Sequence, residues 1–425
     1  MLIDEPTRGM HPSEVEALVK ALLELRDEGH TVIVVEHDPV VIQAADQLID
    51  LGPGAGVAGG QIVAKGNPDE VMKTETPTAR WLRGERRIRL VRWRRHPKGW
   101  LTIKGARANN LQGETVRIPL EILVGICGVS GSGKSTLMID TIGRALAPKK
   151  ITTSVAHQPM DPGEHDSLEG APKKTILLDQ SQRGIRSPAD FLDLLRPLRR
   201  IYAESDDAKA LGLDEKELSR RCSACGGSGL MWMDMGFLPP VQSVCESSRG
   251  TGCRPEAWEV RVKDVAFPDV GGLTIDETYD LFGYDETVAK KLKAAKDVGL
   301  GYLVLRQPAH TLSGGEAQRL RVAKDLAHGT SGGVLYILDE PTVGQHMEDV
   351  SRLVSVLHRL VNEVHSVVVI EHHPHLLTCC DWLIELGPRG GPERGRVIAE
   401  GTPESVAEAQ TPTAPYLKHV LEGKL

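Results

Sequence analysis

The chain has 425 residues, of which 40% are hydrophobic and 26% charged, so it is long enough for two or three globular domains. Its net charge of −7 excludes a global basic field for nucleic acid, so any nucleic-acid surface must be local. Seven cysteines with one Cys-x-x-Cys pair, and no apolar run of transmembrane length, predict a protein of the reducing cytoplasm.

An internal repeat organises the chain. Residues 2–71 align without a gap onto residues 337–406, at a constant offset of 335. The phrase Asp4-Glu5-Pro6-Thr7 in the first repeat matches Asp339-Glu340-Pro341-Thr342 in the second. Because chance does not keep register over such a length, the sequence predicts two copies of one module.

The first copy, residues 1–80, is expected to be the remnant of a module whose front is missing. More than 200 residues of the module precede Asp339, but only three precede Asp4. Glu14–Glu28 is predicted as a helix and Thr31–Val35 as a buried parallel strand. These elements cannot bury both of their faces alone, so we expect them either to pack against another part of a protein or to fold poorly by themselves.

Residues 81–99 are predicted to form a basic linker. Eleven Arg or Lys residues occur in 80–107 against one acid, with Trp81, Trp93 and Trp100 interleaved. Such a stripe fits either contact with nucleic-acid phosphates or a solvated linker. The linker is the preferred interpretation, because runs of like charge repel and extend the chain.

A phosphate-binding loop follows the apolar run Ile122–Cys127, which is predicted as a strand. The next residues match G-x-x-x-x-G-K-[ST] and lead into a predicted helix. Glycines let backbone N–H groups approach phosphate, and the helix start adds a positive end. We expect ATP to bind at Gly128, Val129, Ser130, Gly131, Ser132, Gly133, Lys134, Ser135 and Thr136. Lys134 should reach the β- and γ-phosphates, and the Ser135 hydroxyl should ligate Mg²⁺.

A second apolar run, Val334–Leu338, is predicted as a buried strand that ends in two acids. Asp339 is expected to hold Mg²⁺, directly or through water. Glu340 is expected to polarise the attacking water as a general base. The acids are informative because they accompany the phosphate loop.

A third motif, Leu312–Glu316 (LSGGE), resembles the LSGG-Q/E signature of the ATP-binding-cassette (ABC) superfamily. The resemblance implies that the signature of one cassette closes over ATP held by another. The residues concerned would be Ser313, Gly314, Gly315 and Glu316. It also implies that His372, after the predicted strand Val367–Ile370, is the switch histidine that senses the γ-phosphate, and that Gln180 is the Q-loop glutamine.

Within that superfamily, several phrases resemble the UvrA family of excinuclease components, over nearly the whole chain. They include residues 100–106 (WLTIKGA), 179–181 (DQS), 237–239 (FLP) and 298–302 (VGLGY). The resemblance implies a DNA-damage-recognition ATPase of nucleotide excision repair that uses ATP and Mg²⁺ and is not itself a nuclease. It implies double-stranded DNA and UvrB as partners, although the UvrB-binding region of the family would lie upstream of this chain.

The resemblance also implies an α/β fold, that of a P-loop NTPase of the ABC type with an inserted helical signature domain and a small zinc-ribbon-like cysteine module. Residues 100–150 and 300–425 are expected to form the complete cassette. Residues 151–299 are expected to form the inserted signature and DNA-binding region, with the cysteine module at 222–253.

The cysteine module departs from the family's four-cysteine zinc site. Cys222, Cys225 and Cys245 are present, but the next expected ligand position holds Ser248. A neutral hydroxyl is a poor substitute for a thiolate on zinc. The predicted zinc ligands are therefore the three cysteines and, after a loop shift, Cys253. The alternative is a degenerate knuckle held by packing alone.

Basic residues flank these cysteines and are predicted to contact DNA phosphates. They are Arg220, Arg221, Arg249 and Arg254. The alternative is that they only solvate a surface module.

Other functional classes fit the sequence less well. A transporter cassette would have a shorter segment than the 179 residues between Lys134 and Ser313. Two alternatives remain: a UvrA-like paralogue in drug resistance or self-protection, indicated by Ser248 and Gln345, and an inactive truncated cassette protein. With one phosphate loop and one signature, the chain is expected to complete an ATP site only through self-association or a complementary N-terminal half, and to be a weak ATPase alone.

Overall fold

The computed structural model describes residues 1–54, 56, 59–88, 93–147, 161–236, 238–329, 332–387 and 395–423. Residues 89–92 of the expected linker, residues 151–160 of the expected insert and Phe237 lie outside the described residues. The chain divides into two compact units. We call Met1–Ser181 with Gly329–Leu425 the cassette unit, and Gln182–His328 the insert unit. In the described ranges, no helix combines the length and apolarity needed to cross a bilayer.

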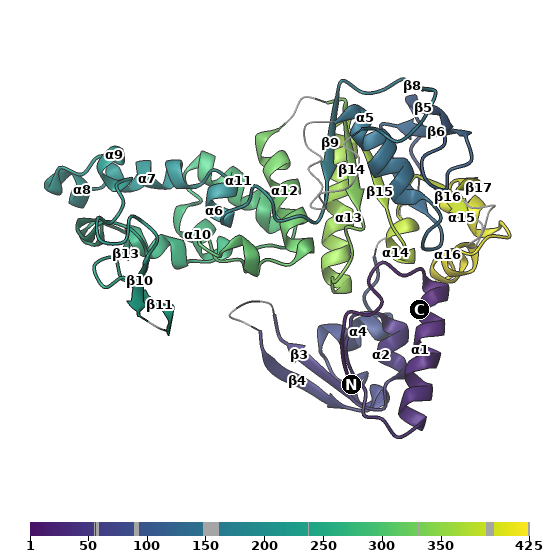
Figure 1. Cartoon of the computed structure of the whole chain (residues 1–425), viewed down its shortest axis with the longest axis horizontal. Coiled ribbons are helices and arrows are strands. Elements are labelled where there is room, and N and C mark those ends of the chain that lie inside the picture. Colours follow the sequence, from purple (N-terminus) through teal and green to yellow (C-terminus); the bar gives the residue numbers. More distant parts are fainter. Residues whose placement is uncertain are drawn as a thin grey trace. The chain divides into compact units, whose positions relative to one another are not determined.

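A six-stranded sheet forms the centre of the cassette unit, in the order β17-β16-β7-β15-β14-β9 (Figure 1). Its strands are β7 (Leu123–Cys127), β9 (Lys174–Leu178), β14 (Val334–Asp339), β15 (Ser366–Ile370), β16 (Trp382–Gly387) and β17 (Arg396–Gly401). All pairs are parallel except β16 with β17. Parallel strands are buried on both faces, which explains why β7, β14 and β15 are continuous apolar runs. The strands predicted over these three segments are confirmed.

Helices and a second sheet surround this core. The helix after the phosphate loop begins with π-helical turns at Thr136–Gly143 and continues as α5 (Arg144–Leu146). The other helices are α13 (Met347–Asn362), α14 (Pro374–Leu377), α15 (Pro403–Ala407) and α16 (Ala414–Leu421). The second sheet has the order β6-β5-β8 and contains β5 (Gly99–Ala106), β6 (Glu114–Leu120) and β8 (Ser167–Glu169). Buried residues of both sheets, among them Leu101, Ile118 and Ile126, form one hydrophobic core.

The described part of residues 1–82, which we call the first repeat, contains four short strands and four α-helices. Its elements are β1 (Leu2–Asp4), α1 (Pro12–Asp27), β2 (Ile33–Val35), α2 (Pro39–Ala44), β3 (Leu48–Gly52), β4 (Gln61–Gly66), α3 (Pro68–Val71) and α4 (Pro77–Leu82). The predicted helix over Glu14–Glu28 is confirmed as α1. The predicted strand is present and parallel to β1, but it is not buried, because Ile33 and Val35 are 57% and 48% exposed.

A comparison of the two repeats explains this exposure. At the offset of 335, β1 to β4 correspond to β14 to β17. In the second repeat, β7 lies between β15 and β16 and pairs with both. In the first, β1-β2 and β3-β4 form separate two-stranded sheets with no described strand between them. Leu2 and Leu51 are therefore 73% and 65% exposed, whereas Ile337 and Leu386 at the same positions are 0% and 1% exposed.

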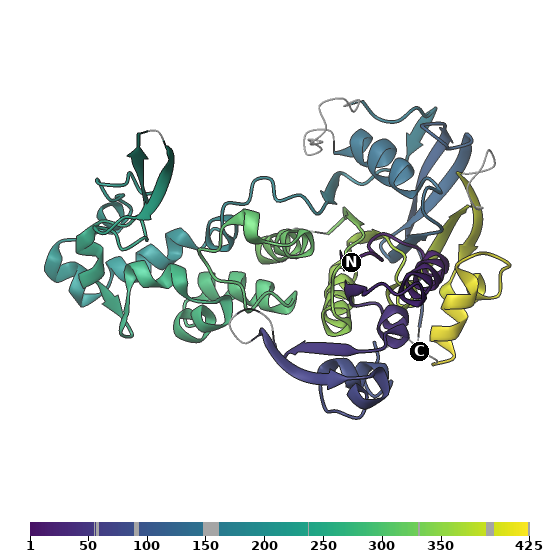
Figure 2. The same ribbon diagram turned by 60° about the horizontal axis from the view of Figure 1, so that its bottom comes forward.

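The insert unit is mainly helical and begins later in the sequence than predicted. Its helices are α6 (Pro188–Phe191), α7 (Leu195–Ala203), α8 (Asp206–Leu211), α9 (Glu215–Leu218), α10 (Ile275–Phe282), α11 (Glu286–Asp297) and α12 (Gly314–His328). Two antiparallel pairs join them, β10 (Leu230–Met235) with β11 (Leu238–Val244) and β12 (Arg261–Val262) with β13 (Val265–Ala266). Figure 2 shows the β10-β11 pair projecting from the helices of this unit.

The expected domain boundaries of 151–299 and 300–425 shift accordingly. Strand β9 belongs to the central sheet of the cassette unit, because it pairs with β14. Helix α12, which begins at the signature, belongs to the insert unit, where it packs against α11. Cys379 and Cys380, just after α14, are fully buried in the core of the cassette unit.

Candidate active site

The phosphate loop follows β7 at the carboxyl edge of the central sheet. Gly128, Gly131 and Gly133 have φ values of 126°, 71° and 102°, a region that favours glycine. A Cβ at Gly128 would collide with the Leu386 carbonyl oxygen on the neighbouring strand. Backbone freedom and the lack of a side chain are thus both required where β7 turns into the loop. The loop then leads into the helix at Thr136, as predicted.

Lys134 lies inside this loop rather than in solvent. Its side chain is buried, and Nζ donates hydrogen bonds of 2.9 Å to the carbonyl oxygens of Gly128 and Val129. Burial lowers the pKa of the Lys134 ammonium, whereas Cys127 and Glu340 oppose that shift. The position places a cation next to the backbone of the loop, where a phosphate-binding lysine is required.

Asp339 ends strand β14, which is separated from β7 by β15, and Glu340 is the next residue. Burial and, to a lesser degree, the neighbouring charges of Glu340 and Glu371 raise the pKa of Asp339 to about 6, against the opposing charge of Lys134. Burial and Glu371 also raise the pKa of Glu340. Glu340 has a left-handed φ of 42°, a strained conformation for a residue with a side chain. Half-buried acids with raised pKa values, together with local backbone strain at one strand end, are features of functional sites.

His372 follows β15 and faces the same acids. Its Nε2 atom lies 3.7 Å from Oε1 of Glu340. Burial and, to a lesser degree, the charges of Lys134 and His11 lower the pKa of His372 to about 2, so the ring is neutral. The preceding Glu371 is buried, and its carboxylate accepts hydrogen bonds from the N–H groups of Thr342 and His372 at 2.9 and 2.8 Å. Glu371 thereby fixes the end of β15 to the end of β14.

Gln180 follows β9 at the same edge. Its Nε2 donates a hydrogen bond of 3.0 Å to the carbonyl oxygen of Glu340. The structure therefore brings together Lys134, Gln180, Asp339, Glu340 and His372, although they come from four different strands and from distant parts of the sequence. Ser135 lies exposed next to Lys134, at the start of the helix.

Residues of the first repeat also reach this site, and sequence reasoning missed them. The Ser130 hydroxyl donates to the carbonyl oxygen of Gly9 at 3.1 Å and is 2.6 Å from Oε2 of Glu14. His11 Nε2 lies 3.1 Å from Oγ1 of Thr413, and its ring is 6.1 Å from that of His372. The available signal was the repeat itself, since equivalent loops that each follow a strand can meet around a local symmetry axis.

The two repeats enclose a cavity of about 510 Å³. The first repeat lines it with Glu5, Arg8 and His37 among others, and the second lines it with Glu340 and His372. Asp38, beside His37, has a pKa raised by burial. The first repeat thus contributes side chains to a shared cavity and is not a detached remnant.

The signature forms a helix N-terminus in the insert unit. The Ser313 N–H donates to Oε2 of Glu316 at 2.7 Å, and the Glu316 N–H donates to Oγ of Ser313 at 3.2 Å. This reciprocal pair stabilises the start of α12 and leaves Gly314 and Gly315 in its first turn. The signature and the phosphate loop belong to different units.

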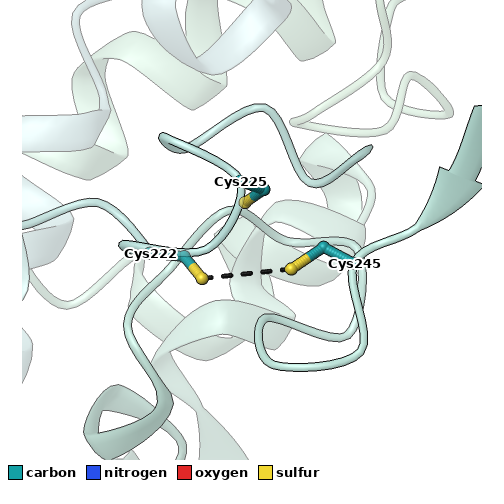
Figure 3. Close-up of side chains that lie close together, drawn as sticks. All are labelled: Cys222, Cys225 and Cys245. Atoms are coloured by element: carbon teal, nitrogen blue, oxygen red, sulfur yellow. Dashed lines mark hydrogen bonds between the residues drawn. The ribbon is translucent and has the colours of Figure 1, made fainter. Parts of the chain in front are cut away.

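The cysteine module brings three thiols together (Figure 3). The Sγ atoms of Cys222, Cys225 and Cys245 all lie within 4.8 Å of one another. Ser248 supplies the fourth neighbour, since its Oγ is 3.7 Å from Sγ of Cys225. Burial raises the pKa of Cys225, but hydrogen bonds from Ser248 and the Gly229 N–H outweigh it and lower the pKa to about 6. Three clustered thiols are a donor set that suits zinc.

Cys253 does not join this cluster, contrary to the expected loop shift. Its backbone forms a β-bridge with Arg221, and its Sγ lies 4.0 Å from the Thr251 carbonyl oxygen. Burial raises the pKa of the Cys253 thiol, which disfavours the thiolate that a metal would need. The β-bridge with Arg221 holds the backbone of Cys253 in place, so the side chain next to the three clustered thiols is that of Ser248.

The arginines around the module have partners within the chain. Arg220 and Arg254 form ion pairs of 2.8 and 2.5 Å with Glu217. The Arg249 guanidinium stacks 4.6 Å from the centre of the Trp258 ring. The Arg221 side chain packs against Gly227. These contacts favour the structural interpretation of the arginines over free phosphate-contacting side chains.

Comparisons with known proteins agree with this geometry. No protein-family model matches the chain. The chain is 43% identical over 433 residues to UvrABC system protein A of Thermus thermophilus, covering 99% of this chain and 45% of that protein. It is 42% identical over 434 residues to the protein of the same name from Aquifex aeolicus, covering 99% and 46%. The chain therefore spans about half the length of these curated relatives.

Solved structures give the same result. The structure of UvrA2 from Deinococcus radiodurans matches with a TM-score of 0.87 and 37% identity, covering 98% of this chain and 51% of that one. A ribosome-bound archaeal Pelota and ABCE1 structure matches at a TM-score of 0.55 with 16% identity, which shows the ABC ATPase fold alone. The α/β fold of the ABC type expected from the sequence is confirmed.

Proposed function

This chain belongs to the UvrA family, and from that premise we propose that it is an ATP-hydrolysing part of the DNA-damage-recognition component of a UvrABC-type nucleotide excision repair system. The observation that carries the proposal is the convergence of Lys134, Asp339, Glu340, His372 and Gln180 around one phosphate loop. Titration of the chain with ATP, with the Lys134→Ala variant as reference, tests it directly.

The residues divide the work of hydrolysis. Lys134 and the loop N–H groups bind the phosphates. Ser135 and Asp339 offer the hydroxyl and carboxylate oxygens that Mg²⁺ prefers, and bound Mg²⁺ neutralises phosphate charge. Glu340 accepts a proton from the attacking water, which its raised pKa favours. The neutral His372, whose ring lies next to Glu340, would contact the γ-phosphate of bound ATP.

The signature would act on ATP bound to another cassette. Ser313, Gly314 and Gly315 present a helix N-terminus, which attracts phosphate. The active assembly is therefore either a self-associated chain or this chain with a complementary N-terminal half. The separated β1-β2 and β3-β4 sheets support the second, because a strand equivalent to β7 would join them. The β7 of a second copy is already paired on both edges and cannot supply it.

Zinc and DNA are the remaining ligands of this proposal. Cys222, Cys225 and Cys245 would hold zinc, which would fix the loops of the module around three thiolates. Double-stranded DNA would bind weakly and without sequence preference, and the arginines around these cysteines would reach its phosphates only by exchanging their internal partners. An affinity that falls with salt would support phosphate contacts.

A UvrA-like paralogue in drug resistance or self-protection is the second candidate. Ser248 favours it, because that residue replaces a thiol of the family's zinc site and lies where the fourth ligand belongs. The two candidates differ in cells: restored survival after ultraviolet irradiation of a strain that lacks its own UvrA supports repair, whereas drug tolerance without such rescue supports the paralogue.

A further inference from the structure

One side chain of the first repeat connects directly to the catalytic strand end of the second. The Arg8 guanidinium donates a hydrogen bond of 2.6 Å from Nη2 to Oε1 of Gln180. The other end of the same amide donates from Nε2 to the Glu340 carbonyl oxygen at 3.0 Å. The Gln180 amide therefore has its orientation set from both ends, by a cation and by the backbone of the proposed base.

The loop that carries Arg8 is itself held at the nucleotide site. The next residue, Gly9, accepts a hydrogen bond from the Ser130 hydroxyl of the phosphate loop. Gly9 has a φ of 69°, and a Cβ there would lie 3.3 Å from Oε2 of Glu340. Glu14, at the start of α1, also reaches Ser130 at 2.6 Å. These contacts fix the backbone on which Arg8 stands.

The second repeat has an equivalent loop without this charge. Thr7 and Gly9 match Thr342 and Gly344, but Arg8 matches Val343. The loops make reciprocal contacts, since a Cβ at Gly344 would lie 2.9 Å from Oε1 of Glu5. An apolar residue therefore suffices for the loop conformation and for its packing against the opposite glutamate. The arginine of the first repeat needs a reason other than folding.

The charge of Arg8 acts on the group next to it. Burial and Glu371 raise the pKa of Glu340, whereas Lys134 and Arg8 lower it. Of the two cations that lower the pKa of Glu340, Arg8 is the one that the first repeat supplies. The planar guanidinium also fixes the Gln180 amide more firmly than a point charge would.

We propose that Arg8 is a positioning residue for ATP hydrolysis, supplied by the first repeat to the nucleotide site of the second, and that it acts by orienting Gln180 against Glu340. The inference rests on the proposed ATPase function. Because the contact involves the hydrolytic side of the site and not Lys134, its loss affects turnover and leaves nucleotide binding intact.

The test compares Arg8→Val, which copies Val343, with the wild-type chain. We expect kcat for ATP to fall about tenfold while KM and the Kd for ATP stay within about twofold. Arg8→Lys should recover only part of the loss. In a Gln180→Leu background, Arg8→Val should lower kcat less than about twofold further, because both changes break one contact. Arg26→Val is the matched control, since Arg26 pairs with Asp27 and Asp46 outside the site.

Hydrogen–deuterium exchange of the segment around Gln180 provides a readout that needs no turnover. Exchange should be faster in Arg8→Val than in the wild-type or Arg26→Val chains. Unchanged kcat in Arg8→Val, full additivity with Gln180→Leu, or unchanged exchange would overturn the inference. A wild-type chain that binds ATP without hydrolysing it would instead refute the proposed function, and the exchange result would then decide on Arg8 alone.

Discussion

Glu5 and Glu340 directly follow the equivalent strands β1 and β14 of the two repeats, and each faces the loop that follows the other. Both have a left-handed φ, of 43° and 42°. Gly9, after Glu5, packs against the Glu340 carboxylate, and Gly344, after Glu340, packs against that of Glu5. The repeats are thus related by a local two-fold arrangement, but the phosphate loop lies on one side of it.

Removal of Lys134 should abolish nucleotide binding. Lys134→Ala takes away the buried cation that the loop carbonyls hold, and the phosphate charge then has no ammonium partner. We expect no measurable heat of binding in isothermal titration with Mg²⁺-ATP. Lys20→Ala on the exposed face of α1 serves as the control and should bind like the wild type. If Lys134→Ala and the wild type bound Mg²⁺-ATP with equal affinity, this segment would not be the phosphate-binding loop.

Asp339 should destabilise the nucleotide-free chain at neutral pH. Its pKa in the folded state is about 6 against an ordinary value of 3.8, so the fold favours the protonated form. The free energy of unfolding therefore falls as pH rises from about 4 to about 6, because the folded state then loses the extra proton. We expect Asp339→Asn to raise the free energy of unfolding by roughly 1 to 3 kcal/mol at pH 7.

Urea denaturation at several pH values checks this sign. The increase in the free energy of unfolding caused by Asp339→Asn should shrink as pH approaches 4, because the wild-type side chain is then protonated and neutral as well. Mg²⁺-ATP should stabilise the wild type but not the variant, since Mg²⁺ needs the carboxylate. A variant less stable than the wild type at pH 7 would contradict the assigned burial of this carboxylate.

The cysteine module should gain zinc affinity when its fourth position receives a thiol. We expect Ser248→Cys to bind zinc about tenfold or more tightly than the wild type, because thiolate is the stronger ligand. Cys222→Ser should lose zinc, and Cys253→Ser should behave like the wild type, since Cys253 lies outside the cluster. Competition with a chromophoric chelator gives the three affinities. If Cys253→Ser lost zinc and Cys222→Ser did not, Cys253 would be a zinc ligand after all, contrary to the structure.

ATP turnover per chain should rise with protein concentration. A single phosphate loop is surrounded on one side by Lys134, Gln180 and Glu340, and a signature from another chain would add donors on the other side. Specific activity should therefore increase steeply across a wide dilution series. Ser313→Arg, which blocks the signature, should stay low at every concentration. Full activity of a monomer, independent of dilution, would exclude the composite site.

The sequence predicted the elements that local pattern determines. Runs such as Val334–Leu338 and the loop at Gly128 identify buried strands and a phosphate site, because β-structure and glycine geometry are encoded in neighbouring residues. The run Thr31–Val35 indicated a buried strand, whereas β2 is exposed because no described strand lies between it and β3. The fourth zinc position was not predictable either, because a backbone bridge at Cys253 decides it.

The contribution of the first repeat is the clearest limit of the sequence. Arg8 and Gln180 are 172 positions apart, and no local pattern connects them. The repeat identified Asp4 and Glu5 as counterparts of Asp339 and Glu340. It did not show that the loop after Glu5 packs into the site of the second repeat.

The expected difference in function between Glu340 and Glu5 provides the most direct test of where ATP is hydrolysed. Glu340→Gln and Glu5→Gln make the same change at symmetric positions, and both variants should bind ATP with the wild-type Kd. We expect Glu340→Gln to lose turnover by roughly two orders of magnitude, because the water loses its base. Glu5→Gln should keep turnover within about threefold of the wild type, because no phosphate loop accompanies it in this chain. Wild-type turnover of Glu340→Gln, or an equal loss in both variants, would contradict the claim that the second repeat holds the hydrolytic site.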